Sequence, residues 1–386
     1  MHKNIWVLTA AQALMMSLNS LTIFVGALVG TNLAPTPELA TLPVATTVVG
    51  TTFSTVPLTL AMQKLGRKYT FLLVAVYSFF LCWITAYVIQ LSNFYLFSLC
   101  TLLLGSNSAT RMQYRFAAME SVAQQDGPKA ASIVLIGGIA SAFLGPEIAV
   151  QGRLLLDAEF AGSYAIISSL FLLGIVLLSF FKNTVPQHEQ SITAGRGWRE
   201  LLSQPVLWVA IFGAAIGYAI MTFIMTATPV SMHLVDGHSL DDTKKVIQSH
   251  IVAMYLPSLF TGLLIKKVGT KKLMISGLII YSICISVAFH GHTFFHYWWA
   301  LLLLGLGWNF LFLGGTALLP FAYAPSERFR IQGLNDFTVF GSQALASLSS
   351  GWIVHSFGWK WLLILSLPFI LLQLFFILWW TKRTAN

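Results

Sequence analysis

The chain of 386 residues is 56% hydrophobic and only 9% charged, with a formal net charge of +9. A soluble globular protein carries about 25% charged residues, so this composition excludes an ordinary soluble domain and predicts an all-α membrane protein that crosses the bilayer many times. The basic residues lie between apolar segments instead of forming one patch or stripe, which argues against nucleic acid as a partner. We expect a monomer surrounded by membrane lipid.

Twelve apolar segments follow one another, and most have the roughly 20 residues that a helix needs to cross a bilayer. The expected spans are 4–30, 40–62, 69–90, 94–118, 130–151 and 161–181, and then 205–232, 244–265, 271–290, 296–320, 331–354 and 359–381. The longest polar stretch, Lys182–Gln204, separates the two sets. We therefore predict an N-terminal six-helix half (1–181), a cytoplasmic linker (182–204) and a C-terminal six-helix half (205–386).

The first span begins almost at the N-terminus, where only His2 and Lys3 precede a long apolar run without a convincing cleavage site. This pattern is typical of a signal anchor. With the N-terminus inside, sixteen of the 22 Lys and Arg residues fall in inner loops and four in outer loops. The positive-inside rule therefore predicts a multi-pass membrane protein with both termini in the cytoplasm.

A short pattern recurs after the second and eighth spans. The segments LGRKYTF (Leu65–Phe71) and VGTKKLM (Val268–Met274) both place a glycine before basic residues. Basic residues alone would only set the topology, but the repeated glycine favours a gating loop in each half. The candidate gating residues are Gly66, Arg67, Lys68, Gly269, Lys271 and Lys272. The loop resembles a pattern of the major facilitator superfamily, but the acidic position of that pattern is Gln63 here and Lys266 in the second copy, which weakens the expectation of the usual gating ion pair.

Two arginines, Arg111 and Arg115, lie within the fourth span, and Glu120 follows them. A charge inside a span is costly unless it faces a cavity or a partner. Arg115 is close enough to the inner surface to extend its head group into water, whereas Arg111 lies about one turn deeper. We predict that Arg111 contacts a cavity or a gate, and that it is not a metal ligand because a guanidinium repels cations.

The fifth span contains the segment LGPE (Leu144–Glu147), whose proline is expected to bend the helix. The segment resembles the superfamily motif called the antiporter signature, but Ser141 and Ala149 replace two of its glycines. It therefore does not predict the direction of transport. Glu147, in the outer part of this span, and Asp336, near the inner start of the eleventh span, are candidates for proton coupling. Glu147 facing the outer water is the alternative.

The seventh span contains MTFIM (Met221–Met225) and the eighth contains HIVAM (His250–Met254). Each segment places two potential metal ligands at i and i+4, on one face of a helix. Counted from the turn near residues 235–242, the two pairs lie at matching depth on antiparallel helices, with layers about 6 Å apart. Thioether sulfur suits Cu(I), and imidazole binds copper in either oxidation state. Methionine also fills gaps in helix packing, so a metal site and simple packing both remain open.

The paired motifs resemble those of the CcoA-like copper transporters (CalT) of the major facilitator superfamily. In that family the four motif residues are the implicated copper ligands, which correspond to Met221, Met225, His250 and Met254. The resemblance implies the superfamily fold, with twelve transmembrane helices in two pseudo-symmetric halves. It also implies import of copper as cargo across the bacterial cytoplasmic (inner) membrane by alternating access, without a resident cofactor. The imported copper would serve cytochrome oxidase assembly, with a cytoplasmic copper acceptor as a candidate partner.

Other functions remain open on the same sequence. CalT relatives include riboflavin transporters, so an organic solute bound by Tyr218, Trp308 and Asn309 is an alternative cargo, and the Gly-Pro of the fifth span suggests proton-coupled drug efflux. A membrane sensor without transport would leave the repeat unexplained, and no catalytic constellation of an enzyme is found. Three histidines on the outer side are expected to be solvated or to capture metal: His290, His292 and His296. Three cysteines form no disulfide framework: Cys82, Cys100 and Cys284.

Overall fold

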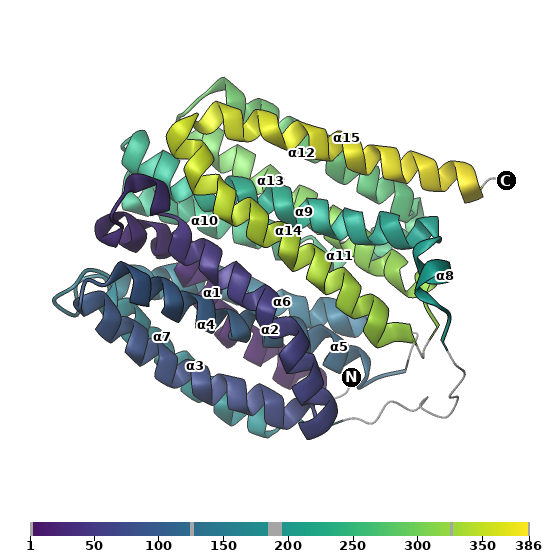
Figure 1. Ribbon diagram of the computed structural model, residues 1–386, viewed down its shortest axis with the longest axis horizontal. Helices are drawn as coiled ribbons and strands as arrows, with labels where there is room; N and C mark the ends of the chain where they lie inside the picture. The colour runs from purple at the N-terminus through teal and green to yellow at the C-terminus, as the bar shows by residue number, and fades with distance from the viewer. Residues whose placement is uncertain (1–2, 124–126, 184–194, 325–326, 385–386) are drawn as a thin grey trace.

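A computed structural model of the protein describes residues 3–123, 127–183, 195–324 and 327–384, which contain helices and no strand (Figure 1). The first half consists of α1 (Lys3–Leu33), the single turn η1 (Pro37–Leu39), α2 (Leu42–Leu65), α3 (Arg67–Gln90), α4 (Phe94–Met112), α5 (Tyr114–Met119), α6 (Gly127–Gln151) and α7 (Ala161–Ser179). The second consists of α8 (Trp198–Leu202), α9 (Pro205–Pro229), the π-helical turn η3 (Val230–Val235), α10 (Leu240–Tyr255), α11 (Ser258–Val268), α12 (Thr270–His290), α13 (Phe294–Leu318), η4 (Leu319–Ala322), α14 (Arg328–Ser356) and α15 (Trp359–Thr384).

The helices of each half pack in the same order. In the first half α1 packs against α6, α2 against α4, and α3 against α7. In the second half α9 packs against α14, α10 against α13, and α12 against α15, so equivalent helices have equivalent partners. The halves lie side by side in Figure 1 and meet where α2 contacts α14 and where α6 contacts α10 and α11.

Nine of the described helices are long and apolar enough to span a membrane, and the pair α10 and α11, bent by 42°, makes ten. The helices at the fourth and eleventh expected spans, α4 with α5 and α14, are more polar. Their polar residues are buried inside the protein, among them Asn107 and Arg111 on α4 and Asp336 on α14. An interior-facing polar residue lowers hydropathy without facing lipid, so these helices complete the expected bundle.

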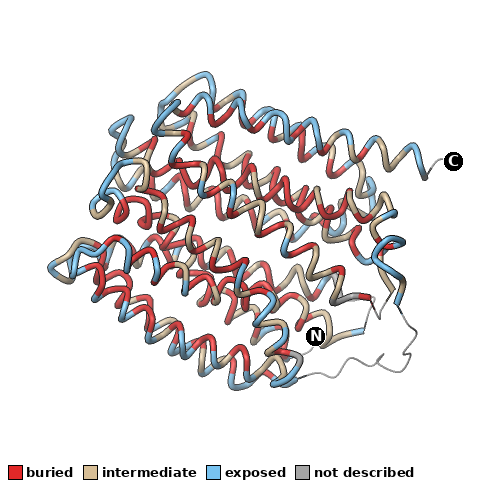
Figure 2. Tube along the Cα trace, viewed as in Figure 1, coloured by how far each residue is buried: buried red, intermediate tan, exposed pale blue. Residues whose placement is uncertain are grey.

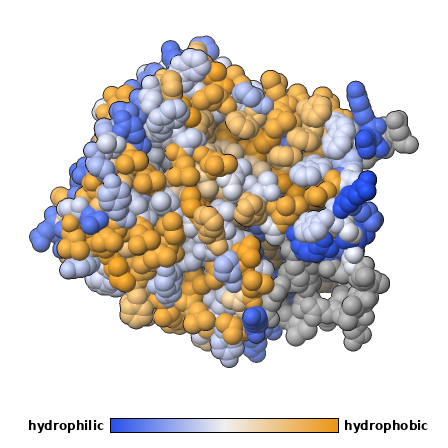
Figure 3. Space-filling model, viewed as in Figure 1, coloured by the Kyte–Doolittle hydropathy of each residue, from blue (hydrophilic) through white to orange (hydrophobic). Residues whose placement is uncertain are grey.

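Burial follows the pattern of a protein surrounded by lipid. Figure 2 shows the buried residues along the inner faces of the helices and exposed residues on their outer faces. Many of those exposed residues are large and apolar, such as Phe53, Leu263 and Leu371, and large apolar surfaces of this kind mark membrane contact. Figure 3 shows hydrophobic residues over the middle of the visible face and hydrophilic ones concentrated toward its two ends.

The start of α1, the short helix α8 and the end of α15 lie at one end of the bundle, here called the termini end; the opposite end is the distal end (Figure 1). Cytoplasmic placement of the termini end stays a prediction from the distribution of basic residues. The bounds of the three predicted units also stay predictions. The predicted linker 182–204 falls partly outside the described residues. Its described part contains the short helix α8, which hydropathy does not predict.

The repeated glycine has the same backbone conformation in both halves. Gly66, between α2 and α3, has φ +83° and ψ 158°, and Gly269, between α11 and α12, has φ +83° and ψ 155°. Positive φ is accessible to glycine at little cost and is unfavourable for other residues. The two loops are therefore structurally equivalent.

Candidate functional site

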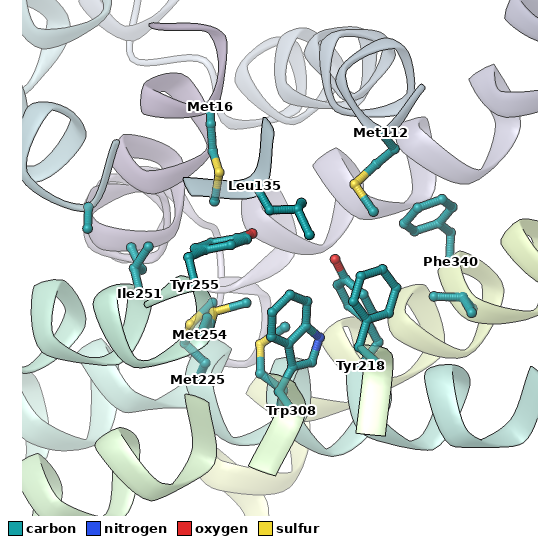
Figure 4. Close-up of a cluster of buried hydrophobic side chains, with 14 of the residues drawn as sticks. Met16, Met112, Leu135, Tyr218, Met225, Ile251, Met254, Tyr255, Trp308 and Phe340 are labelled. Carbon is teal, nitrogen blue, oxygen red and sulfur yellow. The ribbon is translucent and has the colours of Figure 1, made fainter. Parts of the chain in front are cut away.

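A cavity of about 60 Å³ lies between the two halves, midway along the bundle. The first half contributes α1, α2 and α4 to its wall, and the second half contributes α9, α10 and α14. The lining side chains are Met16, Asn19, Ser20, Ile23, Thr47, Val48, Thr51, Ser108, Arg111, Met112, Tyr218, Met221, Met225, Ile251, Met254, Tyr255, Phe340 and Gln343. Figure 4 shows Met16 and Met112 from one half pointing toward Tyr218, Met254 and Tyr255 from the other.

Aromatic rings form the wall of the cavity on the side of the second half. Tyr218 meets Trp308 and Phe312 edge to face, each at 5.1 Å between ring centroids. Trp308 and Phe312, one turn apart on α13, stack at 5.0 Å with an interplanar angle of 13°, and Tyr255 meets Trp308 at 5.5 Å. Trp308 therefore supports the two tyrosines from behind, while the tyrosines line the cavity itself.

Asn309, predicted as part of an organic-solute site, is fully buried and forms hydrogen bonds at the end of α10 instead. Its Nδ2 donates to the carbonyl of Met254 at 2.7 Å and to Ser258 Oγ at 2.8 Å, and its Oδ1 accepts from Thr261 Oγ1 at 2.8 Å. These bonds lie at the break between α10 and α11, where Pro257 cannot donate a backbone hydrogen bond. Asn309 thus satisfies a carbonyl at the bend and fixes the end of α10 beside the cavity.

The four residues of the predicted copper site do not all face the cavity. Met221, Met225 and Met254 line it, so three residues of the two motifs lie at one cavity, while their role as metal ligands stays a prediction. His250 is fully buried, does not line the cavity, and donates from Nδ1 to the carbonyl of Leu301 on α13 at 2.7 Å. Its Nε2 has no hydrogen-bond partner. The structure therefore places three thioethers together and the imidazole against α13.

Arg111, which the sequence predicts at a cavity or a gate, lines the cavity between the halves. It is 6% exposed, and it is the only charged residue among the lining side chains that the structure describes. Its Nε has no hydrogen-bond partner, and its guanidinium interacts with the hydroxyl of Tyr255 from the other half. The cavity therefore contains one positive charge, which favours hydrogen-bond acceptors over cations.

Arg115 is buried, contrary to the expectation that it extends to water. Its Nη2 lies 3.4 Å from Asp336 Oδ1, and the two side chains are 5% and 4% exposed. Arg115 also lies over the rings of Phe116 and Phe312, at 4.7 and 5.1 Å. Because Arg115 belongs to α5 and Asp336 to α14, this ion pair joins the two halves, about one helical turn from Arg111 toward the termini end. The sequence alone gave no signal for this pairing.

Glu147, the other proton-coupling candidate, lies at the distal end. Its Oε2 is 3.4 Å from Lys244 Nζ, and its side chain is 48% exposed. Lys244 also pairs with Asp241 at 3.0 Å. Glu147 therefore faces water, as the alternative interpretation had it, and contributes to a second contact between the halves, α6 with α10.

The gating loop of the first half has an acidic partner in an unexpected place. Arg67 binds Glu120, at the end of α5, through two contacts of 2.6 and 2.8 Å, and its Nη1 donates to Gln113 Oε1 at 3.2 Å. Lys68 donates to the carbonyl of Ser179 at 2.6 Å. The acid absent from the loop pattern is thus replaced by Glu120, and Arg67 holds α5 to the start of α3.

The outer-loop histidines have separate partners. His290 bonds its own helix at the Ser286 carbonyl, His292 contacts Asp236 at 3.0 Å, and His296 contacts Thr293. Among the described residues, no group of three His, Cys, Asp or Glu side chains is arranged to hold a metal. The structure therefore brings no three-histidine capture site together, and the three cysteines are free and buried.

Comparisons with known proteins agree with this architecture. The model of the Major Facilitator Superfamily matches residues 5–257 and 249–386. The riboflavin transporter RfnT of Brucella anthropi is 37% identical over 378 residues, covering 97% of this chain and 94% of that protein. Two uncharacterized MFS-type transporters of Bacillus subtilis, YddS and YdeG, are 29% and 30% identical over 73% and 68% of this chain and 69% and 65% of their own lengths.

A solved structure supports the same fold. The crystal structure of a bacterial homolog of the human lysosomal transporter Spinster, inward-facing and unoccupied, superposes with a TM-score of 0.75 at 12% identity and covers 98% of this chain and 96% of that chain. The predicted superfamily fold is therefore confirmed, and the protein is a membrane transporter and not an enzyme. These relatives do not support the predicted copper branch. The chain belongs to the major facilitator superfamily.

Proposed function

We propose that this protein transports riboflavin or a closely related planar aromatic solute across the bacterial cytoplasmic membrane by alternating access. The observation that carries the proposal is the cavity between the halves, where tyrosine rings and methionine thioethers surround one guanidinium. Ligand sites for organic molecules are mostly apolar and aromatic, with a few well-placed polar groups. The full-length similarity to a riboflavin transporter supports the same choice.

The chemistry of a flavin suits this lining. Its flat ring can stack on Tyr218 and Tyr255, and thioethers make favourable contacts with aromatic rings. The amide side chains of Asn19 and Gln343 are available to a ribityl chain. The cavity of about 60 Å³ is smaller than the roughly 300–1,000 Å³ of pockets that bind drug-sized ligands, so the halves must separate to admit the solute.

The test is uptake of labelled riboflavin into cells or proteoliposomes that contain the intact transporter. We expect saturable uptake, and a loss of at least about tenfold in uptake efficiency when Tyr218→Ala removes a ring that faces the cavity, because base-stacking contacts of this kind contribute about 1–3 kcal/mol. Tyr95→Ala, at an exposed position on α4, is the matched control and should transport normally. Equal uptake in the parent protein and in empty membranes would contradict the proposal.

Copper is the second candidate, because Met221, Met225 and Met254 share one wall of the cavity. His250 adds to this candidate: its Nδ1 is bound to a carbonyl and its Nε2 is free, the arrangement found in most metal-binding histidines. The positive charge of Arg111 in the same cavity opposes it. Copper import for a cytoplasmic acceptor would require the metal to approach that charge.

One variant separates the two cargoes. The triple substitution Met221→Leu/Met225→Leu/Met254→Leu removes the sulfur atoms at nearly constant volume. A riboflavin transporter should keep uptake of riboflavin within about threefold, since such swaps cost little, and copper accumulation should match that of empty membranes. Copper accumulation that depends on the parent protein and disappears in the triple variant would favour copper instead.

The proposal includes the orientation and the coupling predicted from the sequence. The excess of basic residues at the termini end supports cytoplasmic termini. Proton coupling through Asp336 is supported by its burial against Arg115, whereas Glu147 is exposed to solvent. An accessibility scan with a membrane-impermeant thiol reagent, using single cysteines placed at Asn93 and at Lys382, tests the orientation: only the first should react from outside.

A further inference from the structure

We propose that Arg111 is the residue that sets the charge selectivity of the cavity. It admits uncharged or anionic planar solutes that carry hydrogen-bond acceptors, and it rejects planar cations of the same size. The inference rests on the proposed function for its choice of organic solutes, and it goes beyond that proposal by assigning selectivity to one side chain.

The first support is the absence of a counter-charge. Arg111 and Arg115 lie four residues apart, yet Arg115 pairs with Asp336, while no described carboxylate pairs with Arg111 or lines the cavity. A neutralised pair has little field at a distance, so the net positive charge of the cavity comes from Arg111. By Coulomb's law, a guanidinium about 6 Å from a bound cation at an effective dielectric constant of about 20 weakens binding on the order of 100-fold.

The second support is unused hydrogen-bonding capacity. Arg111 Nε is buried without a partner, and a guanidinium presents a rigid fork of donors and no acceptor. A buried donor that stays unsatisfied is costly, so a cargo that supplies acceptors gains affinity. Two adjacent acceptors in one plane, such as a ring carbonyl beside a ring nitrogen, match the fork best.

The third support is the position of Tyr255. Its hydroxyl interacts with Arg111 across the interface, and its ring packs on Gly138 of α6, where any side chain would meet the ring at 2.7 Å. Tyr255 is the last residue of α10, immediately before the break that Asn309 stabilises. Tyr255 of the second half and Arg111 of the first half therefore lie together at the cavity wall, where both meet an incoming solute.

The experiment measures binding to the purified full-length protein in lipid nanodiscs. The probes are riboflavin and lumichrome, which are uncharged tricycles, and proflavine, which is a tricyclic cation. The parent should bind both uncharged probes and bind proflavine on the order of 100-fold more weakly. Arg111→Gln should weaken the uncharged probes about tenfold or more and strengthen proflavine at least tenfold. Arg153→Gln, at an exposed distal loop, should change neither affinity.

Arg111→Lys separates the charge from the planar fork. It should still reject proflavine, because the charge remains, but bind the uncharged probes more weakly, because a lysine lacks the fork. If Arg111→Gln does not elute as a folded protein, Arg111→Lys still tests whether the positive charge rejects cations. Strong proflavine binding by Arg111→Lys would overturn the inference.

The two proposals fail in different ways. If the parent binds neither uncharged probe, the proposed function is wrong; a gain of proflavine binding in Arg111→Gln would still support charge selection by Arg111. If the parent binds riboflavin but Arg111→Gln leaves the ratio of riboflavin to proflavine affinity unchanged, the inference about Arg111 is wrong and the proposed function stands.

Discussion

At the scale of single residues, the neighbours of a charged side chain decide its role. Arg111 and Arg115 occupy the same face of neighbouring turns, but only Arg115 has a carboxylate within reach. Its Nε and Nη1 still have no partner, so Asp336 is its principal compensation. An uncompensated charge in a membrane interior is expensive, and we therefore expect the protein to depend on this pair.

Asp336→Asn should destabilise the protein strongly, because removing one partner of a buried ion pair typically costs about 3–5 kcal/mol. Thermal unfolding of the detergent-solubilised protein measures this effect. The double variant Arg115→Met/Asp336→Leu should recover most of the stability, since apolar residues often replace a buried ion pair without loss. If the single variant is as stable as the parent, the pair is not structural. If Asp336 carries the coupling proton, the recovered double variant should show no acid-driven uptake.

A second ion pair, between the segment before α8 and the residue before α14, gives a pH dependence. Arg196 binds Glu327 at 2.7 and 3.0 Å, and with backbone N–H groups it lowers the pKa of Glu327 from an ordinary value of 4.5 to about 2. A lowered pKa stabilises the fold above the unfolded-state value, and this contribution is lost as pH falls through the folded-state value. The melting temperature of the parent should exceed that of Glu327→Gln by a few degrees above pH 5, and the difference should shrink between about pH 4.5 and pH 2. A constant difference over this range would contradict the assignment.

At the scale of elements, breaks in the helices position the site. The bend between α10 and α11 directs Tyr255 toward the other half, and Asn309 satisfies the backbone there. The break after α4 lies at Gln113, which Arg67 holds. Both breaks come directly after cavity residues, Met112 at the end of α4 and Tyr255 at the end of α10. The helices therefore end their regular course at the site.

The loop glycines allow a matched test at this scale. Gly66→Ala and Gly269→Ala should each cost about 1–3 kcal/mol, because a positive φ combined with an extended ψ is accessible to essentially no residue but glycine. Gly66→Ala should cost more, since its Cβ would lie 2.6 Å from Asn183, whereas Gly269 has open space around it. Gly341→Ala, within α14 and free of close neighbours, should be neutral or stabilising. Equal melting temperatures for all three variants would contradict the backbone argument.

At the scale of the whole molecule, the halves are in close contact at the distal end. Glu147 pairs with Lys244 there, and Glu38 lies 3.2 Å from His355. Gly351 of α14 packs against Thr41, so that a Cβ on Gly351 would lie 3.0 Å from the Thr41 Cβ. A transporter that works by rocking must break these contacts to open the distal side.

Cross-linking tests that requirement. In Thr41→Cys/Gly351→Cys the two Cβ atoms lie close to the 3.5–4.5 Å that a disulfide needs, so oxidation should join the halves after a small adjustment. Uptake should fall to background on oxidation and return on reduction. The two single-cysteine variants are the controls, because the native cysteines are buried. Full uptake by quantitatively cross-linked protein would exclude opening at this contact.

The sequence by itself determined the membrane class, the number and order of the spans, and the equivalence of the loops at Gly66 and Gly269. These features depend on local rules: lipid requires long apolar helices, and positive φ requires glycine. It also predicted that Met221, Met225, His250 and Met254 meet between two helices, because their spacing along each helix fixes which residues share a face.

Only the tertiary structure decided what those faces meet. Three contacts depend on how each helix is rotated and on which helix lies beside it. His250 bonds to Leu301, Arg115 pairs with Asp336, and Glu120 replaces the acid that the loop pattern lacks. Hydropathy does not encode these choices, because in lipid the packing of side chains between helices, and not their apolar character, selects the partner of each helix.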